Sequence, residues 1–176
     1  ALTRLVLTNA IYFNAAWMYP FDEKNTVDGY FVLLNGDTVT VPMMNQSQIF
    51  NYMKGENYQA VELPYDGNEL SMLLIMPDEG SFPSFEQSID NTLVDSIISQ
   101  LGIKQVVLSM PKFEFRTELD LKQILPDMGM PTAFSGMADF SGMTGSRDLY
   151  IAEVLHEAFV SVDEAGTEAA AATAVI

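Results

Sequence analysis

The sequence predicts a mixed α/β (α+β) protein that consists mainly of β-strands. Two long β-prone runs, residues 5–13 and 149–162, lie near the two ends, and shorter strand-like segments separated by turn residues fill the middle. Helical spacing of Leu93, Ile97 and Leu101 adds helix to this pattern. A hydrophobic fraction of 48% with 18% charged residues is typical of a folded globular chain and excludes a disordered one.

The first run, residues 5–13, carries no charge, which favours a central strand buried on both faces. Asn9 in its middle would then be a buried amide that needs hydrogen-bond partners. Residues 31–34 and 38–44 flank Asn35-Gly36, a dipeptide typical of a hairpin turn. Pro42 confines its own segment to a strand end or an edge. Further strands are predicted over residues 49–53, 58–63 and 70–76, with a turn at residues 66–68 between the last two.

The helical signals follow. Residues 81–86 resemble a capped helix start with Pro83 in the first turn, and Gly102 is a plausible stop for the helix that contains Ile97. A strand over residues 106–110 is interrupted by Pro111 and resumes over residues 113–115. Residues 117–120 predict the start of another helix, which ends near Gly129.

The charge of the chain limits its partners. Eight basic against 24 acidic residues give a formal charge of −16, which repels nucleic-acid phosphates and anionic membranes. No apolar run is long enough to span a bilayer. Residues 1–13 read as the interior of a fold, so we expect further chain upstream. Cysteine is absent, which excludes disulfides, thiol catalysis and cysteine-ligated zinc and leaves the compartment open.

No catalytic or metal-binding constellation is found, and we expect neither an enzyme nor a cofactor. Ser141 does not lie in a nucleophile-elbow pattern. Glu153 and His156 would point to opposite faces of a strand and cannot share a metal. The acidic pair Asp163-Glu164 is interpreted as a solvated turn.

The alanine-rich end, residues 164–176, has two interpretations. Propensity alone favours a helix or a frayed tail. As a strand it would place Thr167, Ala169, Ala171, Thr173 and Val175 on one small, uncharged face, with Glu168 on the other. Such a face could enter between existing strands without clashes.

Taken together, motifs along the whole chain resemble the serpin family, in family order. Each is weak alone. They are residues 9–13, Trp17, Pro20-Phe21, residues 41–44, 62–65 and 71–72, Met76-Pro77, residues 111–113, Asp120-Leu121, Met128-Gly129, and residues 138–142, 155–160 and 164–173.

The resemblance implies a partial serpin domain over residues 1–176. Residues 1–163 would form the multi-sheet core with its helices, and residues 164–176 the hinge of the reactive loop. The early helices and the late strands of the family would lie outside this chain, as would the bond that a protease attacks.

The resemblance also implies a function: inhibition of a serine protease, or alternatively a cysteine protease, by a suicide mechanism. The protease cuts the loop, and the loop inserts between strands three and five of sheet A. The implied hinge residues are Glu164, Ala165, Gly166, Thr167, Glu168, Ala169, Ala170, Ala171, Ala172 and Thr173. The implied residues of the region where the sheet opens are Asn9, Trp17, Lys112 and His156.

Individual roles follow from the matched positions. Gly166 would supply backbone freedom and Thr167 would be the first side chain to enter the sheet. Glu164 would pair with Lys112, although an exposed pair of this kind contributes under about 1 kcal/mol. Trp17 would lie at the same opening, and Asn9 and His156 would lie together at the sheet centre.

Two alternatives stay open. A non-inhibitory serpin, acting as carrier, chaperone or storage protein, is disfavoured by the small side chains at Thr167 and residues 169–172. An unrelated β-rich interaction domain with a disordered tail is the second. The family favours an extracellular location over a cytoplasmic one, and the target protease cannot be read because its specificity residue lies outside the chain.

Overall fold

A computed structural model describes residues 5–10 and 13–169. Contacts divide the chain into two compact parts, each assembled from separate stretches. We call them the β4 part (residues 15–113 and 162–167) and the β9 part (residues 1–14, 114–161 and 168–176) after their longest strands. Each is described by itself.

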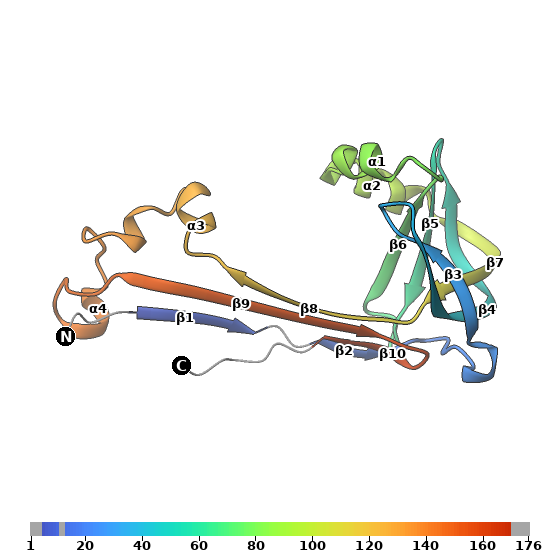
Figure 1. Cartoon of the computed structure of the whole chain (residues 1–176), viewed down its shortest axis with the longest axis horizontal. Helices are drawn as coiled ribbons and strands as arrows, with labels where there is room; N and C mark the ends of the chain where they lie inside the picture. Colours follow the sequence, from blue (N-terminus) through green and yellow to red (C-terminus); the bar gives the residue numbers. More distant parts are fainter. Residues whose placement is uncertain (1–4, 11–12, 170–176) are drawn as a thin grey trace. The chain divides into compact units, whose positions relative to one another are not determined.

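An antiparallel sheet forms the β4 part (Figure 1). Strands β3 (Val27–Val32), β4 (Thr38–Lys54), β5 (Tyr58–Pro64) and β6 (Ser71–Pro77) follow one another, and β7 (Gly102–Pro111) pairs with β4. Helices α1 (Phe82–Ser88) and α2 (Asn91–Gln100) link β6 to β7, and a short 3-10 helix, η1 (Glu23–Asn25), precedes β3. The Asp90 carboxylate caps α2 by accepting a hydrogen bond from the Leu93 amide, at 2.7 Å.

The core of this part lies between α2 and the sheet. Ile97 on α2 is fully buried and clusters with Met53 of β4 and Ala60 of β5. Side chains that pack around them are Tyr58, Leu73, Ile75, Leu93 and Leu101. The helical spacing of the apolar residues on α2 therefore serves to cover one face of the sheet.

Three strands run through the β9 part: β1 (Leu5–Ala10), β8 (Phe113–Asp120) and β9 (Ile151–Val162). β1 is parallel to β9, and β8 pairs with β9 (Figure 1). The connection from β8 to β9 holds two short helices, α3 (Ile124–Asp127) and α4 (Ser141–Thr144), with a 3-10 helix, η2 (Thr132–Phe134), between them.

Two short strands complete the hydrogen-bonded order, which reads β1-β9-β10-β2. β2 (Phe13–Ala16) follows β1 in the chain, and β10 (Gly166–Ala169) follows β9. β10 therefore occupies a place between β9 and β2, while β1 pairs directly with β9.

The mixed α/β class and most predicted strands are confirmed. β5, β6 and β9 match residues 58–63, 70–76 and 149–162 closely. The predicted strands 38–44 and 49–53 form one strand, β4, because β3 and β7 pair with its successive halves. Gly36 has a positive φ of 89° at the predicted hairpin turn, a conformation that favours glycine.

Three predictions about local structure are wrong. Pro42 lies inside β4, where it pairs with Asp28 of β3 and its carbonyl accepts a hydrogen bond from the Lys112 amide, so it marks neither a strand end nor an edge. Residues 117–120 end strand β8 instead of starting a helix, because pairing with β9 overrides the cap-like sequence, and α3 begins only at Ile124. The prediction of a strand buried on both faces is wrong for residues 5–10 of the first run. β1 lies at one end of the strand order, and Val6 and Leu7 are 46% and 39% exposed.

Candidate functional site

The hinge predicted at residues 164–173 begins in a tight turn of the β4 part. The Asp163 carboxylate accepts hydrogen bonds from the amides of Ala165, at 2.8 Å, and Gly166, at 3.1 Å. The Asp163 amide in turn donates to the Gly166 carbonyl, at 3.1 Å. These bonds reverse the chain direction after β9 and start β10 at Gly166.

The turn is held against the segment that follows β2. The Trp17 amide donates to the Ala165 carbonyl and the Phe21 amide to the Glu164 carbonyl, both at 2.9 Å. The Trp17 indole Nε1 donates to the Asp163 carbonyl, also at 2.9 Å. Trp17 is 3% exposed, so the predicted aromatic at the sheet opening is a buried anchor of the turn.

Thr167 is buried, with 6% exposure, and its hydroxyl has a partner. The Tyr65 hydroxyl donates to Thr167 Oγ1 at 2.8 Å, and the Tyr65 ring stacks on Trp17 with centroids 4.7 Å apart. Burial raises the pKa of the Tyr65 hydroxyl above its ordinary value of 10.0, with the Thr167 hydrogen bond opposing. The small hydroxyl of the hinge therefore enters a closed site without leaving an unpaired polar group.

Gly166 lies against the backbone of β2. A Cβ atom built at this position would overlap the Ala15 carbonyl oxygen and would lie 2.9 Å from Ala16 Cα. Gly166 is not among the glycines with positive φ. The structural need is thus for the absence of a side chain, a reason different from the predicted backbone freedom.

Glu164 is the polar centre of the site. Its carboxylate accepts from Lys112 Nζ at 2.7 Å and from the Thr26 hydroxyl at 2.8 Å. The Glu164 side chain is 10% exposed and that of Lys112 is 46% exposed. The interpretation of Asp163-Glu164 as a solvated turn is therefore wrong for Glu164, since its neighbours Lys112 and Thr26 replace water around it.

The Lys112–Glu164 ion pair shifts the pKa of both side chains. The hydrogen bond from Lys112 holds the pKa of Glu164 below its ordinary value of 4.5, against the effect of burial, and the bond to Glu164 raises the pKa of Lys112 above 10.5. A lowered acid pKa means that its stabilisation is present above pH 4.5 and is lost as pH falls through the folded-state value. The raised Lys112 pKa means that its contribution is complete below pH 10.5 and is lost above it.

We expect Glu164→Gln to lower the free energy of unfolding by about 1 kcal/mol at neutral pH, a small effect because water screens Lys112. The difference between wild type and variant should be constant above pH 4.5 and should shrink as pH falls below 4.5 through the folded-state pKa of Glu164, because protonation removes the charge that the variant lacks. Urea unfolding of both proteins from about pH 3 to pH 7 measures it. A difference that stays constant across this range would mean that the charge of Glu164 contributes nothing.

Asn9 and His156 are direct partners in the β1–β9 register, which places their side chains on one face of the sheet. Asn9 is exposed and His156 is partly buried. The expectation that Asn9 is a buried amide is wrong, because β1 is the end strand of its sheet. A role for the two in sheet opening stays a prediction.

The remaining hinge positions are described in part. Ala165 and Glu168 are exposed, and Ala169 ends β10. Ala170, Ala171, Ala172 and Thr173 lie outside the described residues. Within residues 5–10 and 13–169, no three His, Asp or Glu side chains group closely enough to hold a metal ion. No helix in the described chain has the length and apolar character needed to span a membrane.

Sequence reasoning missed three residues of this site. Tyr65 and Thr26 supply hydrogen bonds to Thr167 and Glu164, and Asp163 closes the turn. Tyr65 lies in one of the motif blocks, but no local signal distinguishes its hydroxyl from that of any other strand tyrosine. Thr26 is 138 residues from Glu164 in the chain, a separation at which spacing carries no information.

A family model described as Serpin (serine protease inhibitor) matches residues 1–176. The chain belongs to the serpin family. An uncharacterized serpin-like protein of Thermococcus kodakarensis is 45% identical over 174 residues, 99% of this chain and 40% of that protein. Plasminogen activator inhibitor 1 of Bos taurus is 39% identical over 183 residues, covering 99% of this chain and 46% of the inhibitor.

Solved serpin structures match the fold. The reactive-loop-cleaved human thyroxine-binding globulin has a TM-score of 0.85 at 32% identity and covers 92% of this chain and 48% of its own. This serpin chain spans less than half the length of each of these three proteins.

Proposed function

We propose that this serpin chain carries the sheet and hinge of a serine protease inhibitor that acts as a suicide substrate. The observation that carries the proposal is the position of β10, which lies between β9 and β2 with Thr167 buried. This position supports the proposal, because a loop that inserts after cleavage would enter the sheet from Thr167 onward. The name of the bovine relative, plasminogen activator inhibitor 1, agrees with an inhibitory role.

In the proposed mechanism, cleavage of the reactive loop leads to growth of strand β10. The protease attacks the reactive loop, forms an acyl bond to it and cuts it. The freed loop then extends β10 as a new central strand, in which each added backbone hydrogen bond contributes about 0.5–1.5 kcal/mol net. Summed over the strand, this gain drives the protease to the far end of the sheet and distorts its active site before the acyl bond is hydrolysed. The uncleaved state is then a kinetic trap.

Small side chains at the hinge favour inhibition over a carrier or storage role. The face that follows Thr167 carries alanine and threonine at positions 169, 171 and 173. A bulky or charged side chain there would have to be desolvated during insertion, which costs several kcal/mol for an unpaired charge.

The experiment is to mix the intact protein with trypsin-, elastase- and subtilisin-like serine proteases and separate the products on a denaturing gel. A covalent complex that survives denaturation is the expected result with at least one protease. Cleavage of the loop by all of them, with every protease released active, would favour the non-inhibitory alternative.

A further inference from the structure

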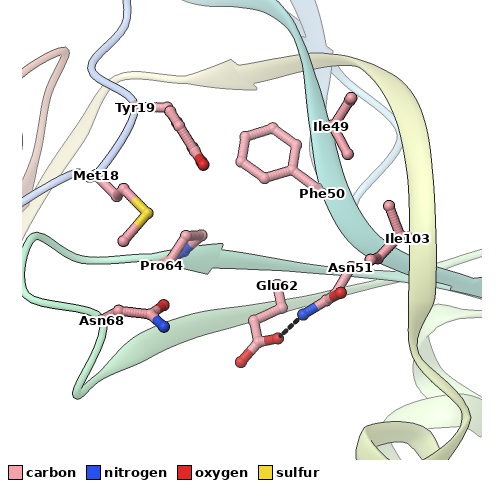
Figure 2. A pocket seen from close by; sticks show the side chains of 9 residues that line it. All are labelled: Met18, Tyr19, Ile49, Phe50, Asn51, Glu62, Pro64, Asn68 and Ile103. Atoms are coloured by element: carbon pink, nitrogen blue, oxygen red, sulfur yellow. Dashed lines mark hydrogen bonds between the residues drawn. The ribbon is translucent and has the colours of Figure 1, made fainter.

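The β4 part contains a pocket of about 310 Å³, a volume in the range of small-molecule sites (Figure 2). It is lined by residues that follow β2, residues of β4 and β5, the turn after β5, and the start of β7. The lining residues are Met18, Tyr19, Ile49, Phe50, Asn51, Glu62, Pro64, Asn68 and Ile103. None of them belongs to the hinge site described above.

One side of the pocket is apolar and aromatic. Phe50 is 4% exposed, and the Tyr19 ring meets it edge to face with centroids 6.0 Å apart. Figure 2 shows these two rings with Met18 along one side and Asn68, Glu62 and Asn51 along the other. Because Phe50 is buried, the surface open to an apolar ring or chain comes from Tyr19, which is 39% exposed, with Met18 and Ile49 beside it in the lining.

The other side holds a fixed negative charge. Glu62 is partly buried, and its two carboxylate oxygens accept hydrogen bonds from Asn51 Nδ2, at 2.8 Å, and Ser71 Oγ, at 2.6 Å. Both donors are neutral, so they orient the carboxylate without balancing its charge. Among the described residues, no lysine, arginine or histidine forms an ion pair with Glu62.

We propose that this pocket binds a small organic cation, with its ammonium or guanidinium group on Glu62 and its apolar body against Tyr19 and Ile49. A cation would supply the countercharge that the described residues do not provide, through a charge-assisted hydrogen bond. A neutral ligand would desolvate the carboxylate without compensation, and an anion would be repelled by it.

The test uses three probes that share one aromatic body and differ in charge: phenethylamine, 2-phenylethanol and 3-phenylpropionate. Binding to the intact protein is followed by NMR shifts and calorimetry. We expect phenethylamine to bind at least about tenfold more tightly than 2-phenylethanol, the ratio typical of one charge-assisted hydrogen bond. Binding of 3-phenylpropionate should be weaker still.

Glu62→Gln should remove the preference for the amine and leave the binding of 2-phenylethanol within about twofold. The matched control is Glu69→Gln, which removes the same charge from an exposed position outside the pocket and should keep the preference. Equal binding of the three probes, no binding of the amine at millimolar concentration, or an equal loss in both variants would each overturn the proposal. These results do not depend on protease inhibition, so they test the pocket separately.

Discussion

Thr167→Arg is expected to turn the protein from an inhibitor into a substrate. Thr167 is 6% exposed and its hydroxyl already accepts the hydrogen bond from Tyr65, so an arginine there would lose its hydration and break that bond. Burying an unpaired charge costs several kcal/mol. A rise of about 1.4 kcal/mol in the insertion barrier lowers the ratio of the insertion rate to the deacylation rate about tenfold. Deacylation should then release active protease before the loop has inserted.

The measurement is the number of inhibitor molecules consumed per protease molecule inactivated. It should rise from about one for wild type to more than about ten for Thr167→Arg. Ala165→Arg is the matched control, because it adds the same charge at an exposed position of the same turn and should inhibit like wild type. If Thr167→Arg still consumed about one inhibitor molecule per protease molecule inactivated, inhibition would not depend on insertion of the loop at this hinge.

Gly166→Ala is expected to displace β10 from β2. The added methyl group would meet the backbone of Ala15 and Ala16, which cannot rotate away as a side chain can. Overpacking of this kind costs about 1–3 kcal/mol. We expect a loss of that size in the free energy of unfolding, with faster hydrogen exchange of the amides in β10.

Gly102→Ala provides the control, since a Cβ there meets nothing within 4 Å and its φ is ordinary. Its free energy of unfolding should stay within about 0.5 kcal/mol of wild type. If Gly166→Ala were equally neutral and its exchange rates unchanged, the close approach of Gly166 to β2 would not exist in solution.

Local sequence patterns predict much of this fold because many of its strands follow alternation, β-branched residues and turn chemistry. The Asn35-Gly36 turn and helix α2 are examples in which local propensity and the final structure agree. Residues 117–120 are the opposite case. Their sequence resembles a helix cap, but they form the end of strand β8 because β8 pairs with β9. The exposure of Asn9 could not be predicted, because burial depends on which strands lie beside β1.

The residues of the hinge site also divide into those that were expected from the sequence and those that depend on distant contacts. Glu164, Lys112, Trp17 and Thr167 were expected from the family resemblance, and the structure gathers them within the β4 part. Tyr65 and Thr26 reach the site through contacts more than 100 residues apart in the chain, which no periodicity reveals. The need for glycine at position 166 also arises from a neighbouring strand rather than from its own backbone angles.

The measurement that tests the central claim most directly compares the unfolding of the intact protein before and after one cut in the reactive loop. We infer that β10 forms the start of a strand that the freed loop completes. The unfolding temperature of the cut protein should then be at least about 10 °C above that of the uncut protein, because insertion adds backbone hydrogen bonds. The cut form of Thr167→Arg should gain much less. An unchanged unfolding temperature in cut wild-type protein would contradict insertion of the loop into the sheet.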